Sequence, residues 1–186
     1  MKQFIDENLG FLRFVSLCML IYGAIYLLYS YVVIETVWFD RYLEVSASLG
    51  SKLVHLITDL ETVVAKQGGI LTRINSVTNP GSYVVVAQGC DASIVFAVLI
   101  STISAWPGKW RHKIPALILG IAIMFGLNIL RIAGMSITET LAPQHFDIMH
   151  EWLLPPLLVV GALIYFFIWT LFSDEHPEDY GIETST

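Results

Sequence analysis

Three side chains in this sequence could together carry out acyl transfer: the thiol of Cys90, the guanidinium group of Arg131 and the imidazole of His150. A thiolate attacks carbonyl carbons, an imidazole moves protons, and a fixed cation stabilises the negative charge that develops on the carbonyl oxygen. Each residue also has an ordinary explanation, because cysteines are often small buried hydrophobes, arginines reach for lipid headgroups and lone histidines are usually surface groups. The chemical interpretation therefore requires a fold that brings the three together.

Cys90 stands just before the apolar stretch Ala92–Gly108. If that stretch is a helix, the dipole at its N-terminus favours the thiolate form of Cys90. Gly89 leaves room for another part of the chain to approach. These features make Cys90 the candidate nucleophile. The second cysteine, Cys18, falls inside a different apolar stretch, so we expect two unpaired thiols.

Arg131 directly follows the apolar stretch Ile114–Leu130. An arginine costs roughly 2.5–3.5 kcal/mol at the centre of a membrane helix and less toward its end, so its presence needs a reason. Asn128 lies three residues earlier and shares its helical face. Two polar groups on one face favour a site over a headgroup anchor, with Arg131 as a catalytic group and Asn128 as a substrate-binding group.

His150 lies just before the apolar stretch Trp152–Ser173. Pro155 and Pro156 suit the first turn of a helix, where a missing N–H group costs little. The dipole at such an N-terminus favours the neutral imidazole, which can act as a base. His145, five residues earlier in the chain, is the competing candidate.

A metal site is the remaining chemical alternative. Four residues could in principle hold zinc: Cys90, His145, Asp147 and His150. The histidine spacing matches no common helical ligand pair. We therefore expect neither a metal nor another cofactor.

The elements that must position these groups are four uncharged apolar stretches. A helix crosses the hydrocarbon layer with about 20 residues, and the lower limit is about 17. Charged residues make up 14% of the chain, against about 25% in ordinary globular domains, and no basic patch indicates a nucleic-acid partner. The sequence predicts an all-α integral membrane protein embedded in the lipid bilayer, with four transmembrane helices over Phe14–Ile34, Ala92–Gly108, Ile114–Leu130 and Trp152–Ser173.

The charges of the connections predict the orientation in the membrane. The connection 107–113 carries three basic residues and no acid, whereas 133–151 carries three acidic residues and neither Lys nor Arg. Short basic loops stay in the cytoplasm. Both termini are then cytoplasmic, including an acidic tail over residues 173–186. The three candidate side chains are expected at the outer ends of three consecutive membrane helices.

The segment between the first two predicted helices, residues 35–89, is expected outside the cytoplasm. Ile70–Val86 predicts a small β-hairpin with its turn at Thr78–Gly81. We divide the chain into 1–34 with the first membrane helix, 35–89, a core over 90–172 and the tail. An extracytoplasmic amphipathic helix is indicated before the hairpin by apolar residues at helical spacing, namely Leu49, Leu53, Leu56, Leu60 and Val63.

The order of these motifs resembles the exosortase/archaeosortase family, and most closely its exosortase H branch. That family has a cysteine that opens one membrane helix, an Asn-x-x-Arg that closes the next and a histidine before the last. Here these are Cys90, the stretch Asn128–Arg131 and His150. The stretches 106–113 and 146–150 are also similar to that branch, and the resemblance covers about residues 85–170.

The resemblance implies a multi-pass cysteine protease or transpeptidase in the inner membrane of a prokaryote. Such an enzyme cleaves proteins near a C-terminal sorting signal, made of a short motif, a membrane helix and a basic cluster, and can transfer them to an acceptor at the outer face. Its partners are those substrate proteins. Cys90, Arg131 and His150 would be the catalytic residues.

Two other interpretations stay open. The chain could be a non-catalytic membrane protein, such as an assembly factor or transporter subunit, with Arg131 as a structural anchor. It could also be an inactive relative that binds sorting signals without cutting them. The second interpretation follows from Ala92, which stands where the family commonly has a glycine two residues after the cysteine.

Overall fold

The computed structural model describes residues 9–67 and 71–173 and shows a mostly helical protein with one small sheet. The predicted acidic tail lies outside the described residues except for Ser173. In chain order the elements are α2 (Leu9–Tyr31), η1 (Val33–Glu35), α3 (Val37–Ile57), β1 (Thr62–Gln67), β2 (Leu71–Ser76), β3 (Tyr83–Val86), α4 (Ser93–Ala105), α5 (Trp110–Leu141), η2 (Pro143–His145), η3 (Ile148–Leu153) and α6 (Leu154–Ser173).

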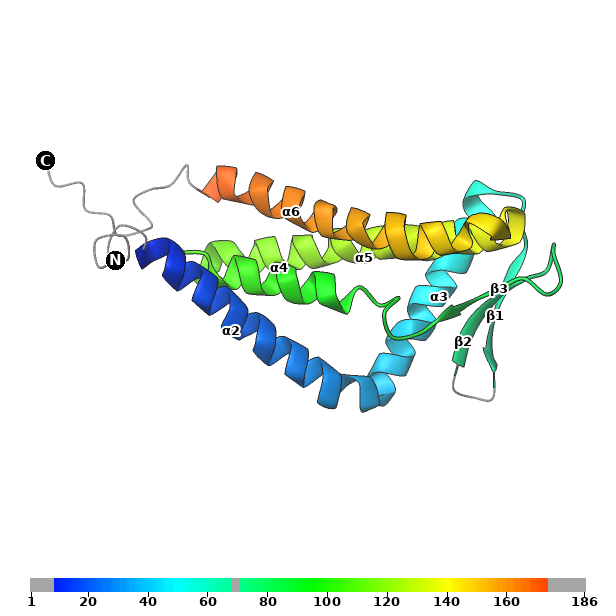
Figure 1. Cartoon of the computed structure of the whole chain (residues 1–186), viewed down its shortest axis with the longest axis horizontal. Helices are drawn as coiled ribbons and strands as arrows, with labels where there is room; N and C mark the ends of the chain where they lie inside the picture. Colours follow the sequence, from blue (N-terminus) through cyan, green and yellow to red (C-terminus); the bar gives the residue numbers. More distant parts are fainter. Residues whose placement is uncertain (1–8, 68–70, 174–186) are drawn as a thin grey trace, which may run out of the picture.

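Four helices, α2, α4, α5 and α6, run along the long axis of the molecule, and α3 crosses near one end (Figure 1). The sheet lies beside α3 at that end. Leu9 and Ser173 lie at the opposite end, together with the turn between α4 and α5. The basic residues of that turn are the reason to assign its end to the cytoplasm, and this orientation stays a prediction.

Three helical stretches are long and apolar enough to cross a membrane: Leu9–Glu35, Trp110–Leu141 and Pro143–Phe172. They confirm the membrane character of three predicted spans. The fourth is not confirmed, because α4 has only 13 residues and rises about 20 Å, against about 30 Å of hydrocarbon. Its first turn follows Ala92, which is left-handed, and its last residue precedes the Trp106–Pro107 pair, which disfavours further helix.

Helix α5 is longer than the predicted span, and the loop expected from residue 133 is wrong. The helix continues to Leu141, and Pro143 follows its end. Ile132 and Met135 are fully buried in a cluster with residues of α3 and the sheet. Tertiary packing thus stabilises about three more turns beyond Leu130, and Arg131 lies within the helix instead of at its C-terminus.

The outer helix was predicted with the wrong bounds and the wrong buried face. Helix α3 spans Val37–Ile57, and Leu56 on the predicted stripe is 80% exposed. Val63 belongs to β1 instead. The buried face is made of Phe39, Leu43, Ser46, Ala47, Gly50, Ser51 and Val54. Its small residues let α3 approach α5 closely.

The predicted hairpin is confirmed by β2 and β3, which pair antiparallel with Ile74 opposite Val84. Gly81 has φ +110° in the turn, a conformation that glycine adopts at little cost. The sequence did not predict β1, which pairs with β2 to give the order β1–β2–β3. Val84 and Val86 pack with Cys90, Ile132 and other buried residues, so β3 leads directly into the segment that contains the candidate nucleophile.

The approach of α3 to α5 can be tested by adding one methyl group at Gly50. A Cβ atom there would lie 2.7 Å from Cγ2 of Ile132, a stiff β-branched side chain. We expect Gly50→Ala to lower stability by about 1–3 kcal/mol through overpacking. Thermal unfolding of the detergent-solubilised protein measures the effect.

Gly134→Ala is the matched control, because a Cβ atom there meets nothing within 4 Å. In a helix interior that change should be neutral or stabilise by about 0.5–1 kcal/mol. Equal effects of the two substitutions would contradict the close packing of α3 on α5.

Candidate active site at the start of α4

The segment between β3 and α4, residues 87–92, is non-helical and compact, and we call it the Cys90 segment. Gly89 has φ +92° and Ala92 has φ +57°. The Cys90 N–H donates to the Ala87 carbonyl at 2.9 Å, which closes a turn. The segment therefore has two left-handed residues, one on each side of Cys90 and Asp91.

Side chains from α5 and α3 bind the carbonyl groups of this segment. Asn128 Nδ2 donates to the Cys90 carbonyl at 2.9 Å, and Arg131 Nη1 donates to the Gly89 carbonyl at 3.2 Å. Tyr42 donates its hydroxyl to the Asp91 carbonyl at 2.7 Å. Buried backbone outside helices and strands requires such partners, because an unpaired carbonyl away from water is costly. Asn128 and Arg131, predicted to share one helical face, both contact the Cys90 segment, and their predicted roles toward a substrate stay predictions.

Asp91 is a central residue that the sequence analysis did not select. It is 2% exposed, and its Oδ1 accepts from the Gly89 N–H at 3.0 Å while Oδ2 accepts from the Tyr29 hydroxyl at 2.7 Å. The only available signal was an acid beside the start of an apolar stretch, which is typical of a helix N-terminus. Its tertiary partners could not be read from that signal.

The surroundings of Tyr42 raise its pKa. Burial, with the added effect of the negative charge of Asp91, raises the pKa of Tyr42 to about 12. The phenol is already protonated at neutral pH at its ordinary pKa of about 10, and the shift extends the pH range over which it donates to the Asp91 carbonyl.

Cys90 itself is 6% exposed and packs among Phe39, Leu43 and Ile132. The N-cap residue of α4 is Ala92. Cys90 lies two residues before this cap, so Asp91 is closer to the positive end of the helix dipole than the thiol is. Both described cysteines are free, as expected.

A cavity of about 420 Å³ adjoins this segment. Arg131 and His150 both line it, together with the two neighbours of Cys90, Gly89 and Asp91. Glu151 and residues of the first turns of α6 complete the wall. Cys90 does not line the cavity, and neither does His145. The structure thus gathers Arg131 and His150 around the backbone of the Cys90 segment, while the thiol is turned into the core.

His150 comes from η3, a π-helical turn that continues into α6. Its ring stacks on Phe146 with ring centroids 5.6 Å apart and 10° between the planes. Pro155 and Pro156 occupy the first turn of α6 as predicted. This stacking fixes the plane of the imidazole at the cavity.

Two buried polar atoms near the cavity lack a hydrogen-bond partner within the described part of the chain. They are Nε of Arg131 and Oδ1 of Asn128. A buried donor or acceptor without a partner is costly, so each of these two atoms needs an explanation. Among residues 9–67 and 71–173, no group of three or more His, Cys, Asp and Glu is arranged to hold a metal ion.

Comparisons with family models, with curated proteins and with solved structures find no match to this chain.

The left-handed conformation of Ala92 predicts a stabilising substitution. A residue with a Cβ atom pays about 1 kcal/mol for this conformation, whereas glycine does not. We expect Ala92→Gly to raise the melting temperature and to leave the contacts of the Cys90 segment intact. Thermal unfolding in detergent measures this, with Ala97→Gly in the helical interior of α4 as a control. A lower melting temperature for Ala92→Gly would contradict it.

Proposed function

We propose that this chain is a membrane cysteine peptidase or transpeptidase of the exosortase type. It would cleave proteins near a C-terminal membrane-anchoring sorting signal and pass the acyl group to water or to an acceptor at the outer face of the membrane. One observation carries the proposal: Arg131, with a buried Nε that has no partner in the described residues, lines one cavity with His150 and both neighbours of Cys90.

In the proposed reaction His150 takes the proton of the Cys90 thiol, and the sulfur attacks the carbonyl carbon of the scissile peptide bond. The C–N bond then breaks, and His150 returns the proton to the leaving amine. Water or an acceptor amine next attacks the thioester, and the sulfur leaves and is reprotonated. The Cys90 side chain must first rotate about its Cα–Cβ bond from the core toward the cavity, since its neighbours already form the cavity wall.

Arg131 would stabilise the oxyanion in both steps. Its Nη1 is bound to the Gly89 carbonyl, so the guanidinium group is oriented before a substrate arrives. Preorganised donors of this kind act strongly in a site that excludes water. Only one of the five N–H groups of Arg131 is used in the bond to the Gly89 carbonyl, so others remain as donors for the substrate oxygen.

The depth of the site suits a bond that lies just outside a substrate's membrane helix. From Trp110 to Arg131, α5 rises about 32 Å, which is close to the thickness of the hydrocarbon layer. Arg131 is thus near the bilayer surface opposite the basic turn. By the charge rule that surface is extracytoplasmic.

A non-catalytic role in binding sorting signals is the second candidate. Two observations favour it: the Cys90 side chain is buried, and Arg131 already has a structural contact with the Gly89 carbonyl. In this role Arg131 and His150 would bind the signal in the cavity, and Cys90 would only fill space in the core.

Co-expression with reporters separates the two roles. The reporters carry a short polar motif, an apolar helix and a basic cluster at the C-terminus, taken from proteins of the same genome. We expect Cys90→Ala to abolish cleavage, because the nucleophile is lost. Arg131→Lys should slow cleavage by about 10²–10³-fold, and His150→Ala by about 10²–10⁴-fold. Immunoblotting measures the cleaved fraction.

Cys18→Ala and His145→Ala are the matched controls, since neither side chain lines the cavity. Both should cleave at the normal rate, and equal accumulation of all variants in membranes must be verified. Normal cleavage by Cys90→Ala would end the catalytic proposal. Reporter binding that survives in Cys90→Ala but is lost in Arg131→Ala, with no cleavage by any form, would favour the binding role.

A further inference from the structure

We propose that Asp91 is a positioning residue for Cys90, and that Tyr29 extends this positioning to the first membrane helix, α2. The consequence for cleavage rests on the function proposed above. The positioning of the thiol can be measured without it.

Asp91 binds both sides of the Cys90 segment. Its carboxylate accepts from the N–H of Gly89, the residue before Cys90, at 3.0 Å. Its own carbonyl accepts from Tyr42 of α3 at 2.7 Å. The Asp91 carboxylate thus spans Cys90 from one neighbour to the other, while Arg131 and Asn128 bind the carbonyls of the two peptide groups next to Cys90. The direction of the thiol therefore depends on Asp91 together with these two side chains.

The second carboxylate oxygen connects this segment to α2. Tyr29 donates its hydroxyl to Oδ2 at 2.7 Å. None of the described residues of α2 is buried. Its other polar or aromatic contacts with the α4 region lie nearer the opposite end of α2, where Phe14 meets Trp106 and Cys18 meets Ser101. The Tyr29 hydrogen bond is thus a polar link from this end of α2 to Asp91, beside the edge-on contact of the Tyr29 ring with Phe39.

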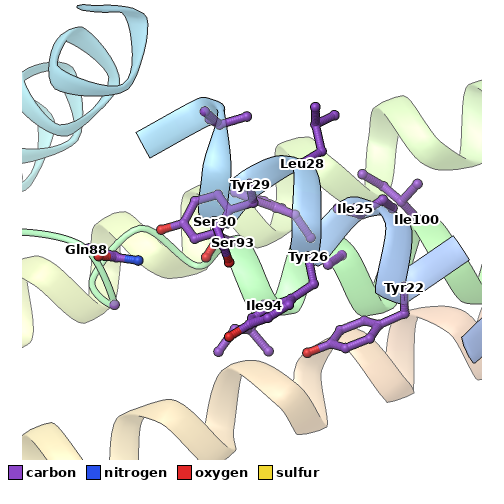
Figure 2. Close-up of a pocket in the computed structure, with 14 residues that line it drawn as sticks. Tyr22, Ile25, Tyr26, Leu28, Tyr29, Ser30, Gln88, Ser93, Ile94 and Ile100 are labelled. Carbon is purple, nitrogen blue, oxygen red and sulfur yellow. The ribbon is translucent and has the colours of Figure 1, made fainter. Parts of the chain in front are cut away.

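An apolar cavity of about 360 Å³ separates α2 from α4 beside this bond. Figure 2 shows the Tyr29 ring reaching from α2 toward Ser93 and Gln88, while the Tyr26 and Tyr22 rings lie farther along the same helix. Gly89 and Ser93 line this cavity and also the cavity that contains Arg131 and His150. A movement of α2 at this cavity would displace Tyr29, and the hydrogen bond from Tyr29 to Asp91 would pass that displacement to the Cys90 segment.

The alternative is a purely structural role, in which the buried Asp91 carboxylate stabilises the fold and does not orient the thiol; we call this the filler role. Two features argue against that. The residue immediately follows the candidate nucleophile, and its carboxylate bonds back to the residue before it. In a filler role the reactivity of Cys90 would follow overall stability, whereas in a positioning role the two can be separated.

The test measures alkylation of Cys90 by N-ethylmaleimide in membranes. The chain has two cysteines, so a Cys18→Ala background leaves Cys90 as the single thiol. We expect Asp91→Ala to release the segment, because both hydrogen bonds to the carboxylate are lost. The alkylation rate should rise at least about tenfold and reporter cleavage should fall at least about tenfold. Unfolding would also expose the buried Cys90 thiol and lower cleavage, so the melting temperature of each variant is measured beside the two rates. A rise in alkylation without a matching fall in melting temperature supports positioning, whereas a rise that follows the melting temperature contradicts it.

Two further variants separate geometry from charge and from folding. Asp91→Asn should keep both rates near normal, because its amide oxygen can accept from Gly89 while its NH₂ group donates to the Tyr29 oxygen. Tyr29→Phe should raise alkylation about threefold, since only one hydrogen bond is lost. Tyr26→Phe is its matched control on the same helix and should change neither rate.

Unchanged alkylation in both Asp91→Ala and Tyr29→Phe would overturn the proposal. So would an Asp91→Asn variant that behaves like Asp91→Ala, because the effect would then come from charge. If Asp91→Ala does not accumulate, the pair Tyr29→Phe and Tyr26→Phe decides the matter. If Cys90→Ala cleaves reporters normally, the proposed function fails, but the alkylation series still decides whether Asp91 positions the thiol.

Discussion

The architecture depends on the hydrogen bonds that hold a short non-helical segment inside a bundle of membrane helices. An unpaired backbone group costs several kcal/mol in hydrocarbon. Here the carbonyls of Gly89, Cys90 and Asp91 accept from Arg131, Asn128 and Tyr42, respectively. These three polar side chains would be costly in lipid, and here their hydrogen bonds to the carbonyls of the segment offset that cost.

This constraint explains the short helix α4 and the position of the sheet. Because side chains of α3 and α5 bind the carbonyls of the segment before α4, that segment need not be helical, and β3 can lead directly into it. Helix α3 brings Tyr42 to the segment, and its small residues permit the close contact with α5. The cavity with Arg131 and His150 then forms where α4, α5 and α6 meet this segment.

Arg131 has both a structural contact and a proposed catalytic role. One nitrogen binds the Gly89 carbonyl, and another is buried without a partner in the described residues. Such an arrangement orients a cation in advance, so little reorganisation is needed when negative charge develops. Asp91 has a complementary role, because it connects the same segment to α2 and α3. The site is therefore coupled to both helices that precede it.

The sequence by itself determined the properties that depend on neighbouring residues. Uninterrupted apolar stretches determined three membrane helices, turn residues determined the hairpin, and helical spacing placed Asn128 with Arg131 on one face. Only the tertiary structure decided that α4 is short, that α5 continues to Leu141, that Cys90 is turned into the core and that Asp91 is buried at the centre of the segment. The reason is physical: each of these features is stabilised by partners far away in the chain, and local pattern carries no information about which partners meet.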